Sequence, residues 1–184
     1  MAGSAERVAD GVRRVAEGVV SPLGLEVVDV VFRRQGKYTL LRIDVDRAGL
    51  PGVSLDDCER ASHAIDVEID SAGLIQDPFE LQVSSPGVER PIVTDDDVRR
   101  NTGRPVRVET AEKIHGAVEF HGVLRGLLRD GLRIESATGE EIVIPRSRVV
   151  SARQDVEADL HAPDGKPRSR GKRDRRGIVQ WPSS

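Results

Sequence analysis

The sequence predicts an α+β fold in which a helix-strand-strand-helix-strand unit precedes a small β-barrel and a disordered basic tail. Two segments before residue 75 repeat apolar residues at the period of an amphipathic helix, and three others alternate apolar and polar residues as half-buried strands do. After residue 105 only strand patterns follow, separated by turn signals. These observations predict an N-terminal α/β domain over residues 1–90, a C-terminal β domain over residues 91–160 and a tail over residues 161–184.

The first unit begins with an amphipathic helix that ends before Pro22. Its apolar residues recur at spacings of four, three and four, at Val8, Val12, Val15 and Val19. A β-hairpin follows, with the strands "LEVVDVVF" and "TLLRIDVD" and a turn at Gly36. In its second strand the side chains alternate, so that Leu41, Ile43 and Val45 face one side and Arg42, Asp44 and Asp46 face the other. One buried side and one wet side indicate an antiparallel sheet covered by helices on a single face.

The second helix starts at Ser54, because Asp57 lies three residues further on in a capping-box pattern. Its apolar stripe runs through Leu55, Cys58, Ala61, Ile65 and Ile69, and Gly73 ends the pattern. Cys58 is the single cysteine, so no internal disulfide is expected, and we interpret it as a small buried residue. The alternating run "FELQV" then predicts a third strand.

The chain beyond Pro91 changes character. Thr94 followed by three aspartates predicts a single short helical turn. Five strand patterns follow at close intervals, in "VRVET", "FHGVLRGLL", "LRIES", "EIVIP" and "RVVSA". Five short strands within about 60 residues are typical of a small closed barrel of the SH3-like or Sm-like type.

Charge is distributed unevenly along the chain. Residues 1–90 carry 10 basic and 16 acidic groups, and residues 163–184 carry 7 basic and 2 acidic groups. The tail is also poor in apolar residues and rich in Pro and Gly, which predicts disorder in the free chain. A basic appendage on an acidic body indicates contact with nucleic acid.

No pattern in the sequence identifies an active site. Ser84 or Ser85 could serve as a nucleophile, but no G-x-S-x-G elbow surrounds them. Gly87 could expose backbone N–H groups to a phosphate, but neither phosphate-binding glycine motif occurs. The four histidines form no ligand cluster, so no metal or cofactor is expected. The N-terminus is too highly charged for a signal peptide and no run of about 18 apolar residues occurs, which predicts a cytoplasmic protein.

The stretch "LQVSSPGVERPI" is interpreted as a constrained joint between the two domains. Gly87 can adopt a positive φ, and Pro91 biases Arg90 towards an extended conformation. The residues assigned to this joint are Ser84, Ser85, Pro86, Gly87, Arg90 and Pro91. A direct contact of Arg90 with RNA or protein is the alternative interpretation.

Four stretches together resemble one known family. They are similar, in the same order and at the same spacing, to the bacterial ribosome maturation factor RimP family, and they read "LEVVDVVFRRQGKYTLLRIDVD", "GVSLDDCERASHAID", "FELQVSSPGVERPI" and "GRPVRVET". The resemblance covers roughly residues 6–155 and is strongest at "VSSPGVERP". It implies an α/β domain with a three-stranded sheet followed by an Sm-like barrel. It also implies a monomeric, non-enzymatic factor that binds the small ribosomal subunit precursor, contacting ribosomal RNA and, through the barrel, small-subunit ribosomal protein number twelve.

Two alternatives remain open from the sequence: a general RNA-binding regulatory module that uses the barrel and tail, and a hydrolase that uses Ser84 or Ser85. The tail has seven cations within eleven residues, which we expect to contact rRNA phosphates, and the alternative is a merely solubilising end. These cations are Lys166, Arg168, Arg170, Lys172, Arg173, Arg175 and Arg176. Trp181 beyond them either stacks on a base or packs on the folded body.

Overall fold

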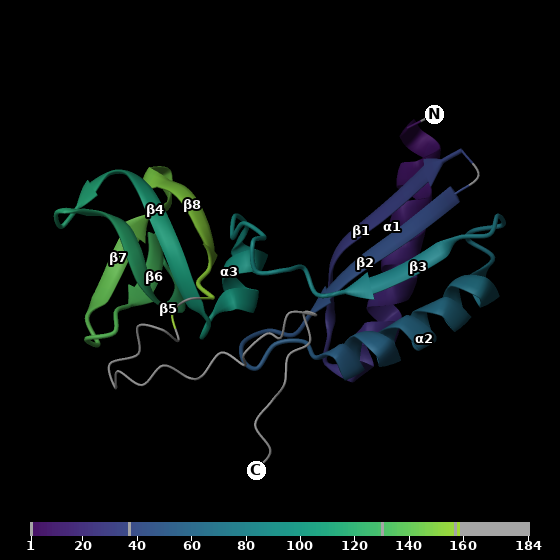
Figure 1. The fold of residues 1–184 in the computed structure, drawn as a ribbon, viewed down its shortest axis with the longest axis horizontal. Coiled ribbons are helices and arrows are strands. Elements are labelled where there is room, and N and C mark those ends of the chain that lie inside the picture. Colours follow the sequence, from purple (N-terminus) through teal and green to yellow (C-terminus); the bar gives the residue numbers. More distant parts are fainter. Residues whose placement is uncertain (1, 37, 130, 157, 159–184) are drawn as a thin grey trace, which may run out of the picture.

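The structure is a computed structural model that describes residues 2–36, 38–129, 131–156 and 158. Two β-sheets lie side by side, and the short helix α3 stands between them on the C-terminal side of the connecting segment (Figure 1). The predicted basic residues of the tail lie outside the described residues.

The N-terminal part has the predicted order of helix, two strands, helix and strand. Its elements are α1 (Ala2–Val20), β1 (Glu26–Gln35), β2 (Tyr38–Asp46), α2 (Leu55–Ala72) and β3 (Glu80–Ser84), with a short 3-10 helix at Ser21–Leu23. The expected capping box is present, because the Ser54 hydroxyl accepts from the backbone N–H of Asp57 and the Asp57 carboxylate accepts from the backbone N–H of Ser54. Gly73 forms the C-cap at a left-handed φ of 61°, as its position predicted.

The three-stranded sheet is mixed, and the expectation of a wholly antiparallel sheet is wrong. β1 and β2 form an antiparallel hairpin, but β3 pairs parallel with the other side of β2, with Leu41 opposite Leu81. The cause is the connection, since α2 carries the chain back along the sheet before β3 begins. A crossover of this length joins parallel strands.

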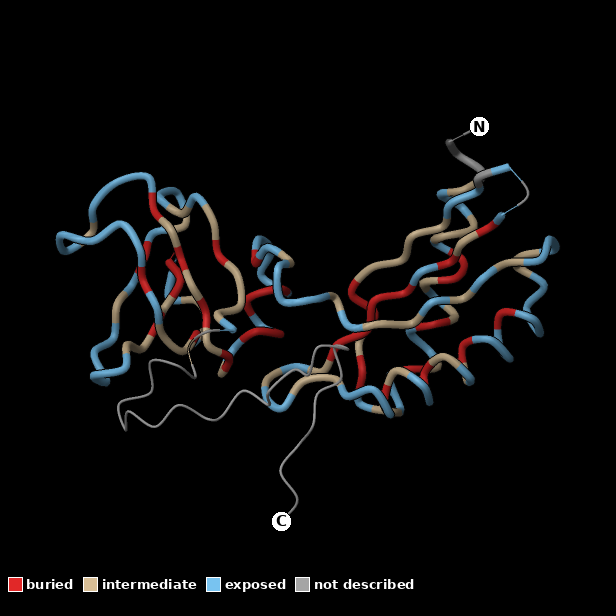
Figure 2. The backbone as a smooth tube through the Cα atoms, in the orientation of Figure 1, coloured by how far each residue is buried: buried red, intermediate tan, exposed pale blue. Residues whose placement is uncertain are grey.

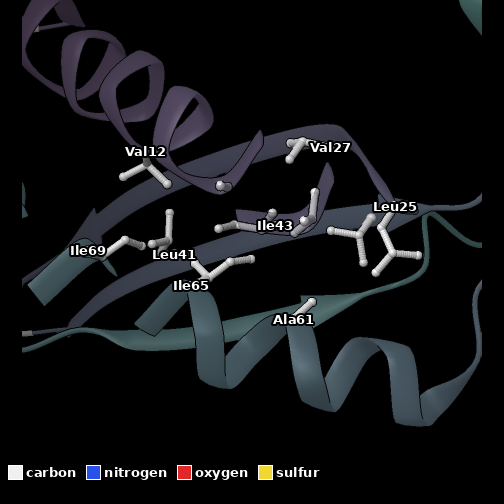
Figure 3. Close-up of a cluster of buried hydrophobic side chains, with 11 residues drawn as sticks. Val12, Leu25, Val27, Leu41, Ile43, Ala61, Ile65 and Ile69 are labelled. Atoms are coloured by element: carbon white, nitrogen blue, oxygen red, sulfur yellow. The ribbon is translucent and has the colours of Figure 1, made fainter. Parts of the chain in front are cut away.

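One face of this sheet is covered by both helices. Leu41, Ile43 and Val45 are fully buried there, as their alternation predicted. They pack between the two helices, and Figure 3 shows Val12 of α1 and Ile65 of α2 approaching them from opposite sides. Leu55 does not join this core, because it lies at the first position of α2 and is 88% exposed.

The opposite face of β2 is only partly exposed to solvent. This corrects the expectation that Arg42, Asp44 and Asp46 all face water. Arg42 is exposed, but Asp44 and Asp46 are 7% and 4% exposed. Asp44 accepts from the guanidinium of Arg42 at 2.8 Å, and Asp46 is covered by Arg104 from the C-terminal part of the chain. A buried carboxylate needs such partners.

The C-terminal part contains α3 (Asp95–Asn101) and five strands. The strands are β4 (Pro105–Ile114), β5 (Ala117–Leu128), β6 (Gly131–Glu135), β7 (Glu141–Pro145) and β8 (Val149–Gln154), with a 3-10 helix at Arg146–Arg148. They form one antiparallel sheet in the order β7-β6-β5-β4-β8. β7 and β8 are the two edges of this sheet among the described residues, so barrel closure stays a prediction.

Glycines let this sheet curve strongly. A Cβ atom at Gly122 of β5 would lie 2.3 Å from the carbonyl oxygen of Glu135 on β6. A Cβ atom at Gly131 of β6 would lie 2.6 Å from the Val143 side chain on β7. The pairing of β5 with β6 also shifts register between Leu124 and Gly126, which adds a bend.

The buried residues form two separate groups, one beneath each sheet (Figure 2). The second group centres on Val108, Ile134 and Ile144 of the C-terminal sheet, which are fully buried. It also includes Val98 of α3 and Ile92 of the connecting segment. The division into domains at residue 90 stays a prediction, but the side chains of the two parts pack into different cores.

Candidate functional site

The residues predicted to form a joint lie between β3 and α3. Ser84 is the last residue of β3, and its hydroxyl donates to the backbone carbonyl of Ser85 at 2.9 Å, not to a base. Gly87 has a φ of 76°, which its lack of a Cβ allows. Its carbonyl accepts from the backbone N–H of Arg90 at 3.4 Å, closing a turn of the connecting segment. Pro86 and Pro91 flank this turn.

Arg90 lies between a carboxylate of each part of the chain. Its guanidinium is 4.0 Å from Asp29 of β1 and 3.9 Å from Asp97 of α3. Its Nε is buried and has no hydrogen-bond partner among the described residues. These distances exceed those of hydrogen bonds, so Arg90 holds the two carboxylates by charge more than by directed contacts.

Asp97 is the most heavily bonded carboxylate of the junction. It accepts from the backbone N–H groups of Val93 and Thr94, from the Thr94 hydroxyl, and from Arg100 at 2.6 Å. Burial opposes its ionisation, but these hydrogen bonds prevail and lower the pKa of Asp97 to about 2. The start of α3 is thereby fixed to the end of the connecting segment.

A buried ion pair joins the two sheets directly. The guanidinium of Arg104, just before β4, donates to both carboxylate oxygens of Asp46, at the end of β2, over 2.8 and 2.9 Å. The two side chains are 7% and 6% exposed. Arg104 Nε also donates to the carbonyl of Gly49 at 2.8 Å, and a further contact reaches the carbonyl of Arg47. Because several N–H groups of one guanidinium are bonded at once, these contacts fix the orientation of the Arg104 side chain as well as its distance from Asp46.

Backbone and surface contacts reinforce this pair. The N–H of Gly49 donates to the carbonyl of Arg100 at 2.9 Å, which ties the loop after β2 to α3. Arg99 of α3 contacts both carboxylate oxygens of Glu26 at the start of β1. The hydrogen bond from Arg99 is the main reason that the pKa of Glu26 is lowered. We name the set formed by Glu26, Asp46, Gly49, Arg99 and Arg104 the interdomain clamp.

A cleft of about 540 Å³ opens beside the clamp, between α1, β1 and α3. Four arginines and four carboxylates line it, namely Arg13, Arg90, Arg99, Arg100, Glu17, Glu26, Asp96 and Asp97. Its size is that of a ligand pocket, but ligand pockets are mostly apolar whereas this lining is charged and balanced. The lining as a whole therefore carries no excess of positive charge that would attract a polyanion into the cleft.

The sequence did not predict the clamp. Alternation predicted Asp46 on the solvent-facing side of its strand, and no role was predicted for Arg104. They lie 58 residues apart, so no local spacing connects them. Arg90 was singled out, but its carboxylate partners Asp29 and Asp97 were not.

Other sequence-predicted features fall partly outside the described residues. Lys166, Arg168, Arg170, Lys172, Arg173, Arg175 and Arg176 all lie there, so their role stays a prediction. Within the described residues, no set of three or more His, Cys, Asp or Glu side chains is arranged to bind a metal ion. None of the described helices combines the length and apolar character needed to cross a bilayer.

The architecture defines an α+β protein that pairs a helix-covered mixed sheet with a curved antiparallel sheet, and its candidate site is the junction between them.

Comparison with protein families identifies the N-terminal part. Residues 15–89 match the RimP N-terminal domain, from the middle of α1 to the turn that precedes Arg90. This match confirms the resemblance to the RimP family that "VSSPGVERP" and the two motifs before it carry. That domain family is associated with the ribosome maturation factor RimP.

Proposed function

We propose that this protein is a cytoplasmic ribosome maturation factor that binds the immature small ribosomal subunit and promotes its assembly without catalysing a reaction. The observation that carries this proposal is the match of residues 15–89 to the RimP N-terminal domain. Ion pairs at the junction are consistent with a binding role, because arginines held by carboxylates fix the surfaces of the two parts of the chain relative to each other. The hydrogen bond of Ser84 to a carbonyl also gives no support to a hydrolase that uses this serine.

The C-terminal sheet is proposed to be an Sm-like barrel domain over residues 91–160 that binds small-subunit ribosomal protein number twelve. Five antiparallel strands with close glycine contacts support the barrel, because tight curvature is what closure of so few strands requires. The ribosomal protein partner rests on the family resemblance. We further propose residues 84–91 as the joint that sets this domain against the first.

Contacts with ribosomal RNA are proposed for Arg90 and for the seven tail cations. Arg90 retains a side chain that is 36% exposed, so its guanidinium can reach a phosphate while it pairs with Asp29 and Asp97. Each phosphate contact made by the tail adds close to one unit to the slope of log affinity against log salt. Truncation after His161 is therefore expected to flatten this slope, and an unchanged slope would identify the tail as a solubilising end.

A general RNA-binding module is the second candidate function. The observation in its favour is that β7 and β8 are the sheet edges among the described residues, because Sm-type RNA binders join such edges into rings. Light scattering distinguishes the two candidates, since the assembly factor is expected to be a monomer and the ring-forming module an oligomer.

The main proposal is tested by sedimentation of a cell lysate that contains the tagged protein. We expect the protein to co-migrate with small-subunit precursors and not with large subunits or complete ribosomes. Deletion of the gene is expected to change the ratio of free subunits. A protein that never migrates with small-subunit particles, and whose deletion leaves the ratio unchanged, would not be this factor.

A further inference from the structure

A second hollow at the junction is lined about equally by polar and apolar surface, and its apolar part is not required by the clamp. It measures about 210 Å³ and is lined by residues of both parts of the chain. Its apolar lining residues are Leu50, Pro51, Val53, Pro86, Val88 and Pro105. The buried pair of Asp46 and Arg104 also lines it. We name this hollow the junction groove.

Large apolar side chains are exposed around this groove. Leu50 is 68% exposed and Val88 is 41% exposed. Val156, next to the lining residue Asp155, is 62% exposed. Leu50 belongs to the loop after β2 and Val88 to the joint, so two segments far apart in sequence present exposed apolar side chains in the groove lining. A gathering of this kind marks a docking surface more often than a solvated one.

Two similar turns form the walls of the junction groove. Pro51, Gly52 and Val53 belong to one wall, and Pro86, Gly87 and Val88 belong to the other. Both glycines have positive φ, 83° and 76°. Each turn contributes one proline to the lining, and a proline ring is already rigid before anything binds. Rigid walls lower the entropic cost of holding a planar side chain such as an aromatic ring.

The end of the chain itself is within reach of this groove. Gln154 and Asp155 line it, and the N–H of Ala158 bonds to the carbonyl of Asp155, so the chain leaves the described part at the groove wall. The first apolar run beyond that point is "IVQW", and Ile178 lies 178 − 158 = 20 residues from Ala158. Twenty residues span up to roughly 70 Å when extended, and closing a loop of this length has a modest entropic cost.

Charge also favours an approach of the C-terminal segment to the junction groove. Seven cations lie between Ala158 and Ile178, whereas residues 1–90 carry 16 acidic and 10 basic groups, a net charge of −6. A cationic segment tethered beside this acidic part is attracted to it over about one Debye length. Trp181 is the only tryptophan of the sequence, and it follows two β-branched residues, which makes this run the strongest apolar anchor in the tail.

We propose that the junction groove binds the segment Ile178–Trp181 of the same chain, with the indole ring of Trp181 against the prolines of the two turns. The hydroxyl of Ser85, on the groove wall, offers an acceptor for the indole N–H. Any partner that uses this groove then competes with the chain's own end. This inference does not depend on the ribosomal role proposed above, because it concerns the free protein.

Intrinsic fluorescence of the full chain tests the proposal, because Trp181 is its single tryptophan. We expect emission shifted to the blue relative to the chain in denaturant, with weak quenching by acrylamide. The double substitution Leu50→Ser and Val88→Ser is expected to shift emission to the red and strengthen quenching. Leu55→Ser, at an 88% exposed leucine that does not line the groove, is the matched control and is expected to change neither.

Three results would overturn the proposal. The first is a wild-type emission equal to that of the chain in denaturant. The second is a blue-shifted emission that the groove substitutions leave unchanged while circular dichroism reports an intact fold. The third is a blue shift that disappears on dilution, which would assign the groove to the tail of a second copy. If the double variant fails to fold, Val88→Ser alone, at a half-exposed position, is expected to give a smaller red shift.

Discussion

Removal of Arg104 is the sharpest perturbation of the interdomain clamp. Arg104→Ala deletes both hydrogen bonds to Asp46 and the bond to the Gly49 carbonyl. It leaves the Asp46 carboxylate, 4% exposed, without its charge partner. We therefore expect a substantial loss of stability and a loosened contact between the two sheets.

The size of the loss follows from what remains around Asp46. Removing one partner of a buried ion pair costs about 3–5 kcal/mol, because the other charge stays buried without compensation. The backbone N–H of Arg47 still donates to Asp46 at 2.8 Å in the variant, and water can enter from the junction groove that this pair lines. Both effects place the expected cost at the lower end, about 3 kcal/mol.

Urea unfolding followed by circular dichroism measures this cost through the linear dependence of the unfolding free energy on urea. Arg125→Ala is the matched control, since Arg125 also pairs with a carboxylate, Glu135, but on the exposed face of the C-terminal sheet. We expect little change from it. Adding Asp46→Asn to Arg104→Ala is expected to recover part of the loss, because the orphaned charge is removed. A cost below about 1 kcal/mol for Arg104→Ala, or no recovery in the double variant, would refute this reasoning.

Three other perturbations test separate parts of the structure. Gly87→Val is expected to lower the free energy of unfolding, measured in urea, by about 1–2 kcal/mol. The loss should come from backbone strain alone, because a Cβ atom at Gly87 meets no atom within 4 Å. Gly87→Asn should lower it clearly less, and equal losses would show that the positive φ is not the cause. Gly122→Ala should destabilise the C-terminal sheet by about 1–3 kcal/mol, because the added Cβ atom would lie 2.3 Å from the Glu135 carbonyl oxygen. An unchanged melting temperature would contradict this. Asp97 has a pKa of about 2 against an ordinary 3.8, so its contribution is complete above about pH 4 and is lost as pH falls towards 2. Asp97→Asn should therefore flatten the decline in unfolding free energy over that range, and an identical decline in both proteins would exclude Asp97 as its source.

The elements that could be predicted from the sequence are those that depend on near neighbours. The capping box at Ser54 was predicted because both partners lie within four residues, and the helix start at Thr94 was predicted from the three aspartates that follow it. The buried face of β2 was predictable because alternation assigns each residue to a side. The parallel pairing of β3 was not, since alternation says which face is buried and nothing about which strand lies alongside.

The junction could be predicted only in part for the same reason. "SSPGVERP" has an unusual local composition, so its turn at Gly87 was expected from single residues. Asp46 and Arg104 lie 58 residues apart, and their pairing arises only when the two sheets meet. A buried charge pair leaves no periodic signal, because each member alone resembles a solvated residue.

The clamp and the junction groove have Asp46 and Arg104 in common, which has a consequence for how the protein responds to ligands. Arg104 bonds to the carbonyl of Gly49, which fixes the loop that carries Leu50 and Pro51 into the groove wall. The opposite wall belongs to the joint at Pro86 to Val88. Anything that occupies the groove therefore contacts both walls and binds best when the clamp is formed. A ligand shifts an equilibrium only through such a difference in affinity, so the groove and the relative placement of the two sheets are thermodynamically linked. Arg104 itself lines the groove, so Arg104→Ala should weaken binding there both directly and by releasing the loop that Arg104 holds.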